Sequence, residues 1–518
     1  MKTHSTVSRR DFMKALGFGT VGVGAMAATV PVFHDLDELM GTKEVTPQKR
    51  PWWVKERDLF NPTSEVDWTI LKRFNRNNEA HTRRVNTMYR TPEVFDAATA
   101  RRDVLNAKRN TDSSGEPGYT RKWNALSAGG GGGMTAWHRD YLGLTTASQI
   151  TKSPSELGVA AWTGTPEEAS KLLYSAMRFY GASYIGYANI EEHWRNSLIV
   201  DTTTDAARDW TWSESNPTPP TSDDNRYVFG DDSTPALRNT HTGSMGRPAG
   251  EMVIPRNGAS IIAFATGACM EATKGLYSTY AKSNSASANN MHEVIGARVQ
   301  NFVRALGGWT AWGLMGHQNA ETNFSGALIL TGISENSRNG CYSLIPEVGP
   351  NHIPTSFMTN MPIAPTKPID AGMFKFCHSC HKCAKVCPSG CISDDKDSSW
   401  EVPPQKSGKA RVFNNPGLKH FWADMPECVW HYQGGTGQSG CWNCYANCTF
   451  SEDRASMIHD MVRGTVATTS IFNGFFASMS NTFEYGEYED PDVWWDMSLP
   501  VYGFDSTIGA TKGIYGKR

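Results

Sequence analysis

The sequence predicts an α+β protein with a large central domain and a cysteine-rich domain near the C-terminus. Helical and strand-like segments alternate between residues 165 and 331, so an α/β sheet is the alternative for the central part. Nine of the 11 cysteines fall between residues 377 and 448 of the 518-residue chain. A chain of this length accommodates two to four domains.

The first cysteine set has the spacing C-x2-C-x2-C-x3-C-P and ends at Pro388. This is the bacterial ferredoxin run, in which the first three thiolates hold one [4Fe–4S] cluster and the fourth binds a second cluster. A second cysteine set after residue 427 supplies the remaining ligands. We therefore predict crossed ligation, with Cys377, Cys380, Cys383 and Cys448 on the first cluster and Cys387, Cys428, Cys441 and Cys444 on the second.

Zinc ligation and disulfide bonding fit these cysteines less well. Zinc sites use four ligands, commonly in two pairs, and a disulfide framework belongs to small secreted domains. The twelve residues between Cys428 and Cys441 leave Cys391 as a substitute ligand. Cys269 and Cys341 are expected to be ordinary buried thiols.

Composition excludes some function classes. The net charge is −2, and no basic run with interleaved aromatic residues is present, so we expect no nucleic-acid partner. No long apolar run follows residue 35, so we expect no transmembrane helix in the body.

The N-terminus contains the twin-arginine motif S-R-R-x-F-x-K from Ser8 to Lys14. A weakly apolar stretch rich in Gly and Ala follows to about Val32, with a possible cleavage signal at residues 25–27. Residues 1–33 are therefore expected to be an export signal segment. This route carries folded proteins, which suits a protein whose metal cofactors are inserted before export.

Residues 34–160 are expected to wrap around the core. They include a glycine run from Gly129 to Gly133. A phosphate-binding loop would need a following Lys-Ser/Thr or a strand–helix context. Neither is present, so the run is predicted to be a flexible loop.

The central domain is placed at residues 161–365. Its clearest element is a helix that begins with a capping box at Thr165 and Glu168, has Pro166 at its first position, and ends at Gly181. Strands are predicted at 183–190, 260–265 and 327–331, and a second helix at 293–306. Residues 201–250 are predicted to be surface loops.

The cluster domain is placed at residues 366–465. Three prolines between 360 and 376 predict an extended connection into it, and apolar spacing from Met457 to Val462 predicts one more helix. Residues 466–518 form a tail whose Trp494 and Trp495 are expected to pack back on the body.

Taken together, these motifs resemble the corrinoid-dependent, membrane-associated reductive dehalogenases of organohalide-respiring bacteria. The resemblance rests on the leader, residues 359–372, the run at 377–388, the split second cysteine set, and the closing region at 466–476 with Trp494 and Trp495. It is continuous from about residue 250 to the end.

The resemblance implies a nitroreductase-like domain that holds a buried, base-off corrinoid, followed by a bacterial ferredoxin-like domain with two [4Fe–4S] clusters. It implies the reaction R–X + 2 e⁻ + H⁺ → R–H + X⁻ on an organohalide such as a chlorinated ethene or a chlorinated aromatic, as terminal reductase of respiration. The sequence lacks the D-x-H-x-x-G signature that supplies a histidine ligand to cobalt in other cobalamin proteins. The implied partners are a small hydrophobic membrane-anchor subunit and a hydrogenase-containing electron-donating complex, at the outer face of the cytoplasmic membrane.

The catalytic positions depart from the family pattern. The family places a tyrosine proton donor thirteen residues before Phe302, where this chain has Asn289. Tyr280 or Tyr277 could substitute if a loop at 283–290 is reshaped. After Gly349-Pro350-Asn351 the family has Arg or Lys, and here His352 is the candidate acid or halide-polarising donor.

Three other functions remain open from the sequence alone. Without a proton donor, dihaloelimination of a vicinal haloalkane would need only electrons. A periplasmic two-cluster electron carrier would need far fewer residues than the roughly 330 that precede the clusters. An enzyme similar to epoxyqueuosine reductase would act on tRNA in the cytoplasm, which the export leader argues against.

Overall fold

The computed structural model describes residues 50–496, apart from residue 52 and residues 111–115, 132–140, 144–149, 202–208, 218–226, 239–250, 275–278, 314–320, 436–439, 452–456 and 483–489. The export signal expected at residues 1–33 lies outside the described residues.

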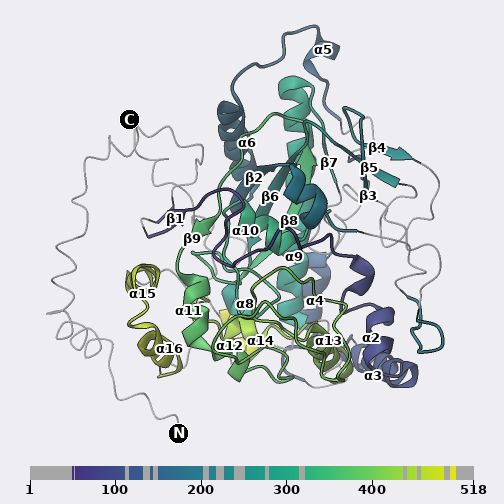
Figure 1. Ribbon diagram of the computed structural model, residues 1–518, viewed down its shortest axis with the longest axis vertical. Coiled ribbons are helices and arrows are strands. Elements are labelled where there is room, and N and C mark those ends of the chain that lie inside the picture. The colour runs from purple at the N-terminus through teal and green to yellow at the C-terminus, as the bar shows by residue number, and fades with distance from the viewer. Residues whose placement is uncertain are drawn as a thin grey trace, which may run out of the picture.

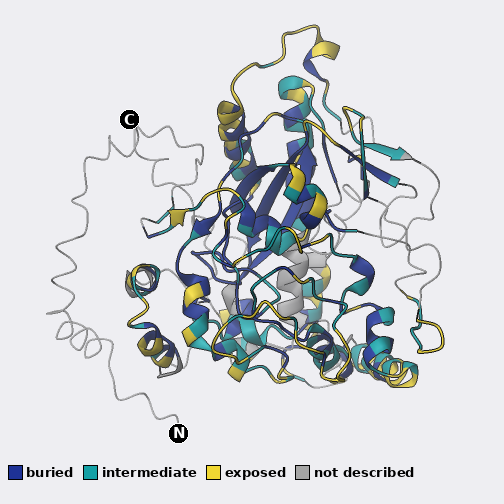
Figure 2. Cartoon of the chain, in the orientation of Figure 1, coloured by how far each residue is buried: buried dark blue, intermediate teal, exposed yellow. Residues whose placement is uncertain are grey.

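A four-stranded antiparallel sheet forms the centre of the fold, in the order β2-β6-β8-β7 (Figure 1). Every residue of β6 and β8 is buried, because other elements cover both faces of the sheet (Figure 2). The predicted strands at 183–190 and 260–265 are confirmed. The strands of this sheet are β2 (Tyr184–Asn189), β6 (Ser260–Gly267), β7 (Ala311–Trp312) and β8 (His352–Thr359).

Helices α6 (Pro166–Tyr180) and α9 (Thr279–Gly307) cover one face of this sheet. The predicted capping box is confirmed: the Thr165 side chain accepts from the Glu168 N–H, and the Glu168 carboxylate accepts from the Thr165 N–H. Gly181 ends α6 in the left-handed conformation. Buried Met177 and Phe264 belong to the core between helix and sheet.

Helix α9 begins much earlier than the predicted helix at 293–306. The loop expected at 283–290 is wrong, because those residues continue α9. Ser, Asn and Ala dominate this stretch, so it shows no apolar period, although Ala favours helix. The C-terminal half of α9 has the expected apolar face, with Val299 and Val303 buried.

The opposite face of the sheet is covered by α10 (Phe324–Leu330) and a small sheet of order β3-β5-β4. The strand predicted at 327–331 is wrong, because Asn323 caps a helix there by accepting from the Gly326 N–H. The all-loop prediction for 201–250 is also wrong in part, since two strands of the small sheet fall inside it. These strands are β3 (Tyr227–Gly230) and β4 (Ala236–Arg238), which flank β5 (Glu251–Pro255).

The N-terminal region contains helices that the sequence pattern did not reveal. Within the predicted glycine loop, residues 129–131 belong to helix α4, and residues 132 and 133 lie outside the described residues. Helix α4 packs along α9. The elements of this region are β1 (Lys55–Glu56), η1 (Arg76–Asn78), α2 (Arg83–Tyr89), α3 (Pro92–Asn110), α4 (Arg121–Gly131) and α5 (Pro154–Leu157).

The cysteine-rich part lies below the central sheet in Figure 1, as a group of short helices. Residues 361–368 enter it without helix or strand, as the prolines predicted, although α11 begins before the end of the predicted connection. Its elements are β9 (Ile369–Asp370), which pairs with β1, then α11 (Met373–Cys380), α12 (Lys382–Lys385), α13 (Met425–Trp430), η4 (His431–Gly435) and α14 (Asn443–Ala446).

Helices α15 (Met457–Thr468) and α16 (Asn473–Thr482) follow, and the first confirms the helix predicted at 457–462. The short helix η5 (Pro491–Asp496) brings Trp494 and Trp495 against Trp123 of α4, with ring centroids 5.5 and 4.7 Å away. The expected return of the tail to the body is therefore confirmed for these residues. The short helices η3 (Trp194–Leu198) and α8 (Met270–Lys274) complete the described elements. None of the described helices combines the length and apolarity needed to cross a membrane.

Candidate active site and cysteine centres

His352 is the first residue of β8 and lies at a buried end of the central sheet, opposite Gly267 of β6. The turn before it contains Gly349 at φ +60°, where an added Cβ would lie 2.7 Å from the backbone oxygen of Phe450. Only glycine fits both the left-handed backbone and this close approach. The turn thus holds His352 near the segment that follows Cys448.

The environment of His352 sets its protonation state. Its side chain is buried, and Nδ1 lies 3.2 Å from the Gly349 carbonyl oxygen. A carbonyl can only accept, so this contact assigns the proton to Nδ1 and leaves a lone pair on Nε2. Burial lowers the pKa of His352 to about 3. At neutral pH the ring is therefore uncharged, and Nε2 is an acceptor.

The segment around His352 contains other buried acceptors. Glu347 Oε2, Asn351 Oδ1 and His352 Nε2 are all buried, and none has a hydrogen-bond partner within the described residues. Buried polar atoms are nearly always paired in folded proteins. Three acceptors within six residues therefore suit a ligand that presents several N–H or O–H donors.

Two tyrosines lie between His352 and the cysteines. The Tyr342 ring centroid is 5.6 Å from that of His352 and 5.2 Å from that of Tyr445. Tyr342 follows Cys341 in the chain, and Tyr445 follows Cys444. Burial raises the pKa of both phenols, so both retain their protons at neutral pH.

Sequence reasoning missed His292, which α9 places against the same sheet end. Its Nε2 lies 3.1 Å from Thr266 Oγ1 and 3.1 Å from the backbone oxygen of Ile353, the residue after His352. The available signal was its position three residues after Asn289, which is nearly one helical turn. That signal appears only once the stretch is known to be helical.

The other predicted catalytic positions, Tyr280 and Asn289, both lie on α9. Nine residues of helix separate them by about 13 Å along the axis. Tyr280 therefore cannot take the place of Asn289 through a reshaped loop, which corrects that expectation. Tyr277 lies outside the described residues.

The two cysteine sets share a local backbone pattern. His381 follows Cys380 and Trp442 follows Cys441, and both have φ +56°. Each is followed by a four-residue helix, α12 or α14. Left-handed backbone is uncommon outside glycine and often marks a functional turn. The same strained turn therefore presents a cysteine pair in each set.

The fold groups the cysteines in the way that crossed ligation requires. Cys377, Cys380 and Cys448 share one apolar cluster, whereas Cys428 and Cys441 belong to another. Cys380 Sγ also lies 3.4 Å from the hydroxyl of Thr449, the residue after Cys448. Cys383 is close enough to Cys377 and Cys448 to interact with them electrostatically.

The second group contains two additional thiols. Cys391 Sγ lies 3.5 Å from Cys387 Sγ, and Cys391 also contacts Cys428. The choice between Cys428 and Cys391 as ligand therefore stays open. Cys341 is half-buried and lies beside Cys428, so the expectation of an ordinary buried thiol is wrong for Cys341. Cys269 is buried as expected.

The thiol environment favours a bound cation. Burial raises the pKa of Cys377, Cys383 and Cys444, so their thiolates form only with compensating positive charge. Sulfur donors select soft metals and iron–sulfur clusters. In the part of the chain that the structure describes, no three His, Cys, Asp or Glu side chains are arranged around a single metal ion. The donor set fits iron–sulfur clusters.

Comparison with known proteins finds matches to reductive dehalogenases. A family model described as the reductive dehalogenase subunit matches residues 49–363. A chloroethene reductive dehalogenase of Dehalococcoides mccartyi strain VS is 28% identical over 97% of this chain and 99% of its own length. A tetrachloroethene reductive dehalogenase of Sulfurospirillum multivorans is 32% identical over 34% of this chain and 32% of its own length.

Among solved structures, the catabolic reductive dehalogenase NpRdhA in complex with 3-bromo-4-hydroxybenzoic acid superposes with a TM-score of 0.51 at 15% identity. The match covers 84% of this chain, which spans about half (49%) of that longer protein. At this identity the likeness concerns the fold, which combines helices and sheet in both.

Proposed function

This chain belongs to the reductive dehalogenase family, and we propose that it reduces a chlorinated ethene with a bound corrinoid and two [4Fe–4S] clusters. The overall reaction is R–X + 2 e⁻ + H⁺ → R–H + X⁻, in which one C–X bond is broken and one C–H bond is formed. Chlorinated ethenes come first because the curated relatives are named for them, and chlorinated aromatics are the next class to test.

The observation that carries the corrinoid proposal is the set of buried acceptors at Glu347, Asn351 and His352. A corrinoid presents amide N–H donors around its periphery, which are the groups that these acceptors lack. Two backbone features place this segment at the end of the central sheet, namely the Gly349 turn and the start of β8. These residues would hold the corrinoid. Once bound, it supplies low-valent cobalt for reducing the carbon–halogen bond.

The cysteines would hold the clusters as the spacing predicts, with Cys377, Cys380, Cys383 and Cys448 on one and Cys387, Cys428, Cys441 and Cys444 on the other. The shared apolar cluster of Cys377, Cys380 and Cys448 supports this crossing. The clusters supply electrons one at a time. In this proposal residues 161–365 form a nitroreductase-like domain and residues 366–465 a ferredoxin-like domain.

The surrounding residues then act on the substrate and on protons. His352 remains uncharged, because its pKa is lowered to about 3, and its Nε2 would accept a hydrogen bond from the bound group. Tyr342, whose ring faces His352, keeps its phenolic proton and can donate it.

A second outcome follows from the same residues. Uncharged His352 has no proton on Nε2, and Asn289 can only orient a substrate. Dihaloelimination of a vicinal haloalkane, X–CR₂–CR₂–X + 2 e⁻ → CR₂=CR₂ + 2 X⁻, needs no proton. Equal turnover of 1,2-dichloroethane and a chloroethene would exclude a preference for this reaction.

We also propose that the twin-arginine leader exports the protein to the outer face of the cytoplasmic membrane, where it stays peripheral. There it would bind a small hydrophobic anchor subunit and receive electrons from a hydrogenase-containing complex. Membrane fractionation of the native organism, with protease treatment of intact cells, tests the location. Protection from the protease in intact cells would contradict it.

The deciding experiment is anaerobic reconstitution with iron, sulfide and cobalamin, followed by metal analysis and a halide-release assay with a reduced viologen. We expect about eight irons per chain, as two [4Fe–4S] clusters require, about one cobalt, and chloride release from a chloroethene. Eight irons with no cobalt would contradict the corrinoid proposal and support a two-cluster electron carrier. Activity on epoxyqueuosine tRNA without halide release would point to the RNA-modifying enzymes instead.

A further inference from the structure

Arg338 is a buried arginine that touches the first cysteine group. Its Nε donates to the Cys377 carbonyl oxygen at 2.9 Å. Its Nη1 donates to the carbonyl oxygens of Ser393 at 2.8 Å and Asp395 at 2.7 Å. The guanidinium lies 3.9 Å above the Phe421 ring. The side chain is thus fixed between α11 and the segment at 393–395.

These carbonyl contacts leave one N–H group and the positive charge of Arg338 without a partner among the residues that the structure describes. Its Nη2 is buried and has no hydrogen-bond partner within the described residues. No carboxylate forms an ion pair with it in the described part of the chain. Asp394 acts on its charge from a distance and pairs instead with His381 at 2.7 Å. The thiols of Cys377, Cys383 and Cys380 are the other groups that act on its charge.

A buried cation without a counter-ion is costly unless an anionic partner is present. Four thiolates around an iron–sulfur cubane carry net negative charge, and reduction adds one more electron. The free N–H of Arg338 and its uncompensated positive charge would both stabilise this negative charge. Arg is suited to the task because it stays protonated at any pH that a protein survives.

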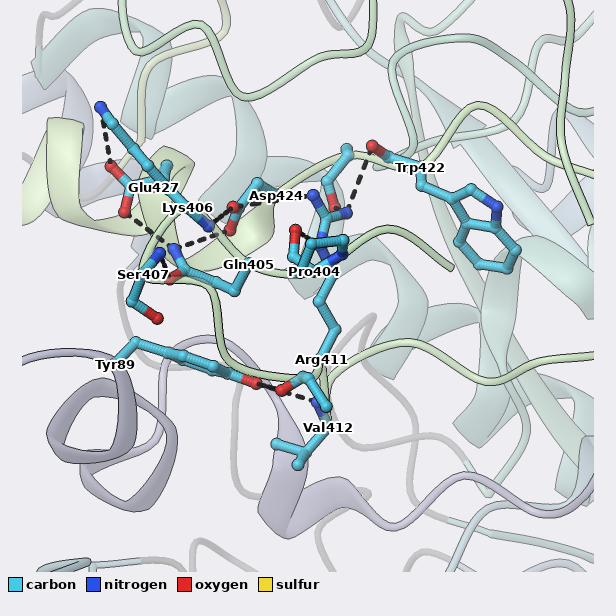
Figure 3. Close-up of polar contacts among 12 residues, drawn as sticks. Tyr89, Pro404, Gln405, Lys406, Ser407, Arg411, Val412, Trp422, Asp424 and Glu427 are labelled. Carbon is cyan, nitrogen blue, oxygen red and sulfur yellow. Dashed lines mark hydrogen bonds and ion pairs between the residues drawn. The ribbon is translucent and has the colours of Figure 1, made fainter. Parts of the chain in front are cut away.

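A second arginine provides a natural comparison (Figure 3). Arg411 makes a similar carbonyl clamp, donating to the backbone oxygens of Pro404, Trp422 and Ala423 at 3.2 to 3.3 Å. It lies near Cys391 of the second group. Its charge, however, is balanced by Asp424, whose Oδ2 is 3.7 Å from Nη2. The two sites differ mainly in the counter-ion.

We propose that Arg338 is a positioning residue that raises the reduction potential of the cluster held by Cys377, Cys380, Cys383 and Cys448, by placing an uncompensated charge and an N–H donor beside it. The step concerned is [4Fe–4S]²⁺ + e⁻ → [4Fe–4S]⁺, with the electron supplied by the respiratory donor or, in vitro, by dithionite. This inference rests on the proposed two-cluster content.

The test is an EPR-monitored redox titration of the reconstituted enzyme and its Arg338→Gln, Arg338→Lys and Arg411→Gln variants, each with its iron content measured. Arg338→Gln should lower the reduced-to-oxidised ratio of one cluster about tenfold at a fixed potential, which is about 59 mV for a one-electron couple. One unit charge a few ångström away at an effective dielectric constant of about 20 is sufficient for this. Arg338→Lys keeps the charge but withdraws Nη2, so a smaller shift of the same sign is expected.

The outcomes separate the possibilities. A shift confined to one cluster in both Arg338 variants, with little change in Arg411→Gln, supports the proposal. Full iron content with unchanged potentials in Arg338→Gln, or equal shifts in Arg338→Gln and Arg411→Gln, overturns it. Wild-type protein with fewer than about eight irons would instead contradict the two-cluster content itself.

Discussion

Replacing Glu335 by Gln should remove a pH-dependent loss of stability. Glu335 is 1% exposed. Its Oε2 accepts from the backbone N–H groups of Ala371 at 3.1 Å and Met373 at 2.8 Å, at the start of α11. Burial raises the pKa of this carboxyl to about 7 from 4.5, and the Met373 hydrogen bond only partly opposes that rise.

The direction of the change in stability with pH follows from which state binds the proton. Between pH 4.5 and 7 the folded protein holds this proton and the unfolded chain releases it, so stability falls as the pH rises through that window. At about 1.4 kcal/mol per pKa unit, the loss of unfolding free energy reaches about 3 kcal/mol by pH 8. A 518-residue chain has an unfolding entropy of about 2 cal/mol/K per residue, which converts this loss to about 3 °C in Tm.

The assay compares the Tm of reconstituted wild-type enzyme and Glu335→Gln between pH 5 and pH 8. The two should agree at pH 5, because Gln resembles the protonated carboxyl, and the variant should melt about 3 °C higher at pH 8. Glu335→Ala is the matched control: it leaves two N–H groups without an acceptor and should melt lower at every pH. A Tm difference that is the same at pH 5 and pH 8 would refute the argument.

Three further predictions concern the site and the fold. Cys448→Ser should reduce iron from about eight to about four per chain, whereas Cys341→Ser should leave it unchanged; equal losses in the two would contradict crossed ligation. The pKa of His352 is lowered to about 3, so the unfolded state binds its proton first as the pH falls below 6.5. The Tm of His352→Gln should therefore fall less than that of wild type as the pH is lowered, and equal falls in Tm would count against a neutral ring. Thr165→Ala should cost about 1 kcal/mol of unfolding free energy through the lost cap of α6 with no change in halide release, and an unchanged denaturation midpoint would disprove the role of the cap.

Local chemistry determines which elements were predictable. Helix α6 has its start and stop signals in adjacent residues, so Thr165 and Gly181 identified both ends. The short apolar run at 327–331 gives no such signal, because a buried strand and a buried helix look alike over five residues. At 327–331 the helix is fixed by Asn323, which precedes the run and whose side chain caps α10.

The sequence did not reveal which ionisable residues are buried. Glu335 and Arg338 lie in a polar stretch with Asn336, Ser337 and Asn339 that resembles a surface loop. Their burial depends on partners more than thirty residues away, such as Met373 for Glu335 and Cys377 for Arg338. The cysteine spacing, by contrast, indicates an iron–sulfur cluster from the sequence alone.

His352 shows how burial can change a role that a sequence suggests. Its position in the family pattern belongs to a basic residue, which led to the expectation of an acid or a halide-polarising donor. The structure places its Nδ1 on the Gly349 carbonyl and lowers its pKa to about 3, so the ring presents a lone pair where Arg or Lys would present a charge. In the proposed site, the neutral ring of His352 would offer a departing chloride no proton on Nε2. With His352 neutral, we propose that Tyr342 or water supplies the proton for hydrogenolysis. A substrate that loses two halides would need no proton donor.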